Sequence, residues 1–140
     1  MRAVPAGTGV HRLGEGPVWD AARQRLLWVD IMSGLVFAGR LDPAGGAITV
    51  TETWEFDDLA GAVAVSADGD LLVAERDRLT VVRADGTRQP TERLPLHPHS
   101  RLNDGAVDPQ GRYLVGSMAL DDRRGSDLLI RVDGASRTVL

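Results

Sequence analysis

Residues 61–74 read GAVAVSADGDLLVA, and this stretch decides the fold. Two short apolar runs rich in β-branched residues flank an Asp-Gly pair, which is a strong hairpin signal. The pattern recurs upstream as GPVWDAARQRLLWV at 16–29 and downstream as GAVDPQGRYLVG at 105–116. The opening glycines of the three copies stand 45 and 44 residues apart. The sequence therefore predicts three copies of one hairpin-based unit.

Further strands follow each hairpin. A third strand is predicted in every unit, at 35–38, 79–82 and 128–132, and a fourth at 48–54. Residues 136–140 have the pattern of another fourth strand at its start. Four short strands in about 40–50 residues are typical of a β-propeller blade. We predict an all-β propeller, incomplete, with about three blades near 12–57, 58–100 and 101–140. A β-sandwich with accidental spacing is the alternative.

Composition excludes several classes of protein. The chain of 140 residues has no cysteine, which removes disulfides, thiolate zinc sites and cysteine nucleophiles. The formal net charge is −4 without a basic cluster, so no nucleic-acid partner is expected. No apolar run approaches the roughly 20 residues that span a bilayer, so no membrane partner is expected. Residues 1–7 lack the apolar core of a signal peptide, so a cytoplasmic location is expected.

The repeat also predicts where polar groups meet. Equivalent positions of successive blades approach one central axis, and the residue before the opening glycine is Glu15, Ala60 or Asp104. We therefore expect Glu15, Asn103 and Asp104 near one end of the channel. Carboxylate and amide oxygens suit Ca²⁺ or Mg²⁺, and Arg101 could bind an anionic or hydroxylated substrate. The alternatives are a solvated Glu15 and a plain Asn-Asp-Gly turn.

Two motifs carry a family resemblance. The segment LGEGPVW at 13–19 resembles the opening of the SMP-30/gluconolactonase/LRE family, which includes regucalcin and sugar lactonases. RLNDG at 101–105, followed by VDPQGRY at 107–113 and GSM at 116–118, resembles the family's second signature. The resemblance implies a six-bladed propeller that binds one divalent metal ion (Ca, Zn, Mg or Mn) and hydrolyses a sugar lactone.

The resemblance also implies roles for single residues. Glu15 matches the family's first metal ligand, and Arg101 and Asn103 match its substrate-contacting pair. Asp104 lies in the same motif without an assigned role. The acid after the Gly-Ser-Met motif contacts substrate, and here it is Asp121 in place of glutamate. Asp122 could replace it.

The resemblance covers only the N-terminal half of the family. The second metal ligand, an Asn in a Ser-Asn-Gly motif, and the third, an Asp that is also the general base, would follow Leu140. No catalytic residue is therefore assigned within the chain. The expectation is a truncated protein that is inactive alone and that self-associates through exposed strand edges.

Three functional hypotheses remain open. The first is a part of a metal-dependent lactone hydrolase, and the second is a non-catalytic propeller fragment that binds a partner or itself. The third is a propeller without lactonase chemistry. A serine hydrolase is disfavoured because no Gly-x-Ser-x-Gly motif surrounds Ser117. His97 and His99 are interpreted as loop residues, Glu75 as structural, and the tryptophans at 19, 28 and 54 as blade packing.

Overall fold

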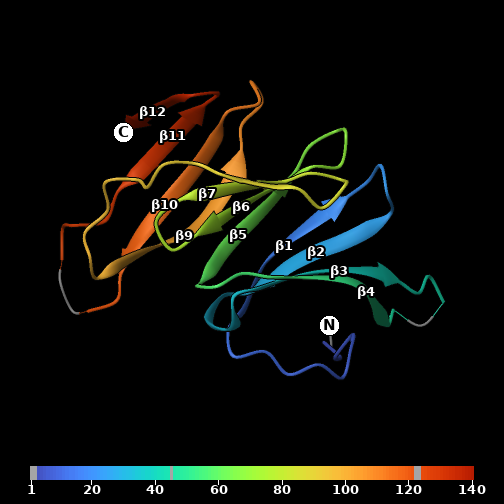
Figure 1. Ribbon diagram of the computed structural model, residues 1–140. Helices are drawn as coiled ribbons and strands as arrows, with labels where there is room; N and C mark the ends of the chain where they lie inside the picture. Colours follow the sequence, from blue (N-terminus) through green and yellow to red (C-terminus); the bar gives the residue numbers. More distant parts are fainter. Residues whose placement is uncertain (1–2, 45, 122–123) are drawn as a thin grey trace.

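The computed structural model describes residues 3–44, 46–121 and 124–140, which form three four-stranded antiparallel sheets. Figure 1 shows the sheets side by side, with β5 in the middle. The first sheet holds β1 (Gly14–Asp20), β2 (Arg25–Asp30), β3 (Leu35–Leu41) and β4 (Ile48–Glu55), with the 3₁₀ turn η1 (Ile31–Ser33) after β2. The second holds β5 (Ala60–Val65), β6 (Leu71–Glu75), β7 (Leu79–Val82) and β8 (Arg88–Pro90). The third holds β9 (Ser100–Val107), β10 (Tyr113–Ala119), β11 (Leu129–Asp133) and β12 (Ser136–Val139).

Each sheet is a meander in which every strand pairs with the next one along the chain. This arrangement confirms the predicted all-β class, and β12 confirms the strand predicted near the C-terminus. The strand β8 is a difference from the sequence analysis. Its residues RQP are all exposed and lack an apolar alternation, so nothing in the pattern marked it. In the described part of the chain, no helix has the length and apolarity needed to cross a membrane.

The core lies on the two sides of β5. Because successive strand residues point to opposite faces, Val63 packs towards the first sheet, whereas Ala62 and Ala64 pack towards the third. Ala60 also packs towards the first sheet because the strand is irregular between Ala60 and Ala62. The first cluster is completed by buried residues such as Leu27, Val29 and Val36, and the second by Leu102, Val115 and Ile130. Small side chains on β5 allow both neighbouring sheets to approach it closely.

The tryptophan prediction is correct for two of three residues. Trp54 packs against the first cluster, and Trp28 stacks on Phe37 with ring centroids 5.3 Å apart. Trp19 is 47% exposed, so its assignment to blade packing is wrong. It points away from the face of β1 that carries Val18, and no described sheet covers that opposite face.

The first strand of every sheet carries an irregularity at the same end. The pairing register shifts between Glu15 and Val18 in β1, and between Ala60 and Ala62 in β5. In β9 it shifts in the step from Leu102 to Gly105. Such bulges bend a strand and redirect its side chains. They place Glu15 at the edge of the first bulge and residues 103–104 inside the third.

Two buried aspartates hold the first sheet together. Asp30 is 3% exposed and accepts hydrogen bonds of 2.9 Å from the backbone N–H groups of Arg12 and Leu13. Burial alone would raise the pKa of Asp30, but the hydrogen bonds from Leu13 and Arg12 outweigh it and lower the pKa. At Asp20 burial likewise raises the pKa, but the Arg25 hydrogen bond, 3.0 Å from Nε, and the contacts from Arg23 together outweigh it and lower the pKa.

These pKa shifts predict a loss of stability in acid. Both carboxyls have a lower pKa in the folded chain than in the unfolded chain, so the unfolded chain takes up protons first. Their contribution to the free energy of unfolding is complete above the pKa of about 4 that they have in the unfolded chain. It is lost as pH falls through the lower pKa values that they have in the folded chain. Urea unfolding at pH 7 and pH 3 measures this difference. In Asp30→Ala we expect the free energy of unfolding to fall by about 2 kcal/mol at pH 7. The difference in this free energy between pH 7 and pH 3 should be smaller than in the parent protein. An unchanged pH effect would contradict the assignment.

Candidate functional site

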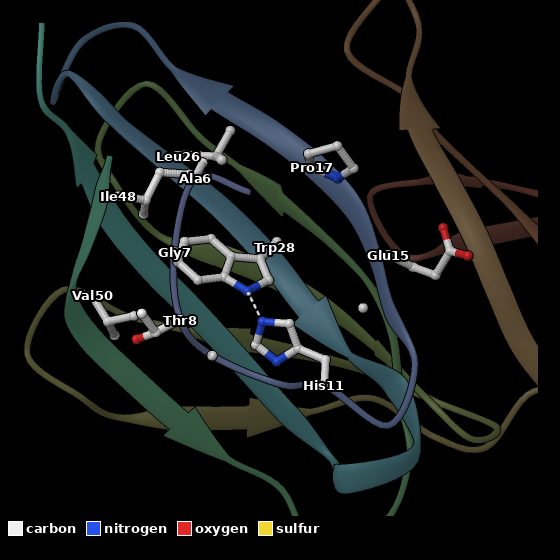
Figure 2. A pocket seen from close by; sticks show the side chains of 12 residues that line it. Ala6, Gly7, Thr8, His11, Glu15, Pro17, Leu26, Trp28, Ile48 and Val50 are labelled. Atoms are coloured by element: carbon white, nitrogen blue, oxygen red, sulfur yellow. Dashed lines mark hydrogen bonds between the residues drawn. The ribbon is translucent and has the colours of Figure 1, made fainter. Parts of the chain in front are cut away.

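A hollow of about 550 Å³ lies where the bulges of β1 and β9 face each other. The residues that line it come from all three sheets: Leu13, Glu15, Gly16, Pro17, Ile31, Gly61, Arg101, Asn103, Asp104 and Met118. The structure thus brings Glu15 together with Arg101, Asn103 and Asp104, as the repeat predicted. In Figure 2 the Glu15 side chain points away from the first sheet, towards the brown ribbon of the third.

Arg101 is the buried cation of this hollow. Its side chain is 4% exposed, and its Nη1 donates to the carbonyl of Leu102 at 3.0 Å and to Asn103 Oδ1 at 2.7 Å. Its Nε is buried and has no hydrogen-bond partner among the described residues. Burial lowers the pKa of Arg101, and the nearby Glu15 carboxylate opposes that shift. A guanidinium stays protonated in proteins, so Arg101 is a fixed cation in the wall of the hollow.

Asn103 is oriented by Arg101. Because a guanidinium only donates, the amide oxygen of Asn103 must face it, and the NH₂ group is left as a donor. This contact takes one of the two lone pairs of the amide oxygen. The NH₂ group can donate to oxygen atoms of a ligand.

Glu15 is the carboxylate of the hollow that is suited to serve as a metal ligand. Its side chain is exposed to the hollow, and a carboxylate oxygen is a hard ligand. Asp104 is also exposed, but its Oδ1 accepts from the Gly105 N–H at 2.8 Å. Within residues 3–44, 46–121 and 124–140, no group of three or more His, Asp or Glu side chains could hold a metal ion. Glu15 therefore fits one position of a metal site whose full ligand set these residues do not supply.

Asp121 is not brought to the hollow. It lies in the bend after β10, with an exposed side chain, and does not line the cavity. Asp122, its suggested replacement, lies outside the described residues. Met118, on β10, lines the cavity. The sequence analysis did not select Met118, although it belongs to the quoted GSM motif.

The other polar candidates have structural surroundings. Ser117 Oγ accepts from the Leu128 N–H at 2.8 Å and thereby fixes the loop before β11. Glu75 accepts a hydrogen bond from the Thr80 hydroxyl. The rings of His97 and His99 lie 5.9 Å apart on the connection before β9. These contacts agree with the structural interpretations of Ser117 and Glu75 and with the loop interpretation of the two histidines.

A second hollow, of about 610 Å³, lies under the N-terminal segment on the far face of the first sheet. Figure 2 shows its floor, where Trp28 Nε1 donates to His11 Nε2 at 3.2 Å. Its other walls are small or apolar, including Ala6, Leu26 and Val50. Glu15 and Pro17 line both hollows.

Known proteins resemble this chain in sequence. The family model described as SMP-30/Gluconolactonase/LRE-like region matches residues 13–140. The chain is 42% identical over 129 residues to the pentonolactonase XacC of Haloferax volcanii, covering 91% of this chain and 42% of that protein. It is 37% identical over 129 residues to a 6-deoxy-6-sulfogluconolactonase of Pseudomonas putida, covering 89% and 42%.

Solved structures resemble it as well. A structure of the calcium-binding protein regucalcin from Agrobacterium tumefaciens superposes with a TM-score of 0.72 at 27% identity, over 93% of this chain and 43% of that one. A luciferin-regenerating enzyme gives a TM-score of 0.76 at 23% identity, over 94% and 46%, which shows the shared propeller fold. The chain spans less than half the length of these relatives. With its three blade-like sheets and both signature motifs, it belongs to the SMP-30/gluconolactonase/LRE family.

Proposed function

We propose that this chain is the part of a sugar lactone hydrolase that orients the lactone and supplies one ligand to a divalent metal ion. The observation that carries the proposal is the single hollow shared by the Glu15 carboxylate, the Arg101 guanidinium and the Asn103 amide. Relatives named for sulfogluconolactonase and pentonolactonase activity support the substrate class.

The described residues fit the binding of a cyclic ester. A sugar lactone presents a carbonyl, a ring oxygen and several hydroxyl groups, all of which accept hydrogen bonds. The Arg101 guanidinium lines the hollow, and Asn103 offers its NH₂ group. Because Arg101 is buried and Asn103 is held by it, both donors are fixed before a ligand arrives. Such orientation of the ester is a large part of the barrier reduction in enzymes.

Glu15 would hold the divalent ion (Ca, Zn, Mg or Mn), which supplies Lewis-acid polarisation of the lactone carbonyl and a more acidic bound water. In the overall reaction water adds to the carbonyl carbon, the ring C–O bond breaks, and the ring oxygen receives a proton to give the aldonic acid. Among the described residues of the hollow, Asp104 is the only other carboxylate, and its Oδ1 accepts from the Gly105 N–H. The general base is therefore not assigned to this chain.

The 140-residue chain by itself is expected to show no lactone hydrolysis above the spontaneous rate. The reason is that the described residues supply one metal ligand and no assigned base. Acid release from D-glucono-δ-lactone, with and without added Ca²⁺, Mg²⁺, Mn²⁺ or Zn²⁺, measures this, with Arg101→Ala as the comparison. Rapid turnover by the chain alone, lost in Arg101→Ala, would show that the catalytic set is complete here.

A second candidate function is self-association. Large apolar side chains are exposed on the outer two sheets, among them Trp19 and Val50 on the first and Leu129 and Val139 on the third. The strand β12 also forms an edge of its sheet, and unpaired edges favour association. Light scattering after gel filtration tests this candidate. A cytoplasmic location and the absence of nucleic-acid and membrane partners stay predictions from the sequence.

A further inference from the structure

The peptide of Leu102 connects the two substrate-facing residues to the second sheet. Leu102 lies between Arg101 and Asn103, and its side chain is fully buried. Its carbonyl accepts from Arg101 Nη1, while its N–H donates to the backbone carbonyl of Arg76 at 2.7 Å. The Leu102 peptide therefore links the Arg76 backbone to the Arg101 guanidinium, which in turn holds Asn103.

Arg76 lies in the turn between β6 and β7, and an ion pair fixes its side chain. Its Nε donates to Asp58 Oδ2 at 2.6 Å and its Nη2 to Asp58 Oδ1 at 3.1 Å. This two-point contact sets the direction of the guanidinium as well as its distance. Asp58 belongs to the connection between the first and second sheets, so the pair ties that connection to the turn.

Asp58 is itself held in place. Its Oδ1 also accepts from the Leu59 N–H at 2.8 Å, and Leu59 is buried in the first cluster. A Cβ at Gly34, where φ is +65°, would lie 2.4 Å from the carbonyl oxygen of Asp58. Gly34 therefore allows a close approach that seats Asp58 against the first sheet.

We infer that the Asp58–Arg76 pair is a positioning device that sets Arg101 and Asn103 through the Leu102 peptide. The path crosses all three sheets, from Gly34 through Asp58 and Arg76 to the third bulge. Arg76 is a positioning residue and does not line the hollow. The ion pair is about one third exposed on the arginine side, so its removal should affect geometry more than stability. The consequence for ligand binding rests on the proposed function.

A single probe reports on this geometry. Asn103 is the only asparagine of the chain, so selective ¹⁵N-asparagine labelling gives one backbone signal and one side-chain NH₂ pair. In Arg76→Ala and in Asp58→Ala, neither of which adds an asparagine, we expect the side-chain NH₂ signals to shift. Hydrogen exchange of the Leu102 amide should become about tenfold faster. Thermal melting should stay close to that of the parent protein, and Arg76→Lys should restore part of the parent spectrum.

Arg78→Ala is the matched control. Arg78 lies in the same turn, and its ion pair is with Asp77, at 4.0 Å. It should leave the Asn103 signals and Leu102 exchange unchanged. Parent-like Asn103 signals in both Arg76→Ala and Asp58→Ala would overturn the inference. Titration with D-gluconate separates the two claims: signal shifts without gluconate binding to any variant would leave the positioning device intact but contradict the proposed function.

Discussion

Under the proposed function, Glu15→Gln is expected to weaken divalent metal binding by about 100-fold or more and to remove any lactone hydrolysis that the parent protein shows. Glutamine keeps the size of the side chain but removes its charge. Loss of groups that merely support a metal ligand already costs about 10- to 100-fold in affinity or activity. Loss of a charged ligand should cost at least as much. Calorimetric titration with Ca²⁺, Mg²⁺, Mn²⁺ and Zn²⁺, alongside the hydrolysis rate, measures both effects.

Glu55→Gln is the control for this substitution. Glu55 ends β4 with an exposed side chain and does not line the hollow, so the same chemical change there should leave affinity and rate unchanged. If Glu15→Gln bound the same ions as tightly as the parent, Glu15 would not be a metal ligand. The proposed role of this carboxylate would then have to be abandoned.

Gly61→Ala is expected to destabilise the chain by about 1–3 kcal/mol, towards the upper end of that range. A Cβ at Gly61 would lie 2.5 Å from the Leu102 carbonyl oxygen and 2.8 Å from that of Asn103. Both are backbone atoms of the neighbouring sheet, so β9 has to move. Because this part of β9 carries Arg101 and Asn103, the Asn103 side-chain NMR signals should shift too. Urea unfolding measures the loss of stability.

Gly116→Ala provides the comparison for Gly61→Ala. At Gly116 an added Cβ would meet one atom, the Asp104 carbonyl oxygen at 3.9 Å, which is ordinary contact. The substitution should therefore cost much less than Gly61→Ala. Equal stability of Gly61→Ala and the parent would show that β5 and β9 do not approach as closely as described.

The meeting of these side chains in one hollow could be predicted from the sequence because equivalent residues of successive repeats occupy equivalent positions in neighbouring sheets. The glycines at 16, 61 and 105 mark equivalent points of three sheets. From this equivalence we could predict that Glu15 lies close to residues 103 and 104. The strands were predictable for a similar reason. Apolar runs separated by Asp-Gly or Pro-containing turns leave few alternatives to short antiparallel pairing.

The remaining details depend on three-dimensional contacts that a repeat does not record. The bulge in β9 determines how residues 102–105 turn, and only the structure shows that Arg101 donates to the Asn103 amide oxygen. Asp121 was selected from the resemblance, but it lies beyond β10 and outside the hollow. The contribution of Arg76 to the site is made by its backbone carbonyl. A main-chain contact of this kind leaves no mark in the residue pattern.

The most direct test of the account is the proximity of residue 15 to Asn103. The chain has no cysteine, so Glu15→Cys accepts a single nitroxide spin label. With ¹⁵N-asparagine labelling, the account predicts that this label broadens the Asn103 side-chain signals severely. The same label at Ala44→Cys, on the β3–β4 turn away from the third sheet (Figure 1), should leave them sharp. Sharp Asn103 signals with the label at residue 15 would contradict the shared hollow.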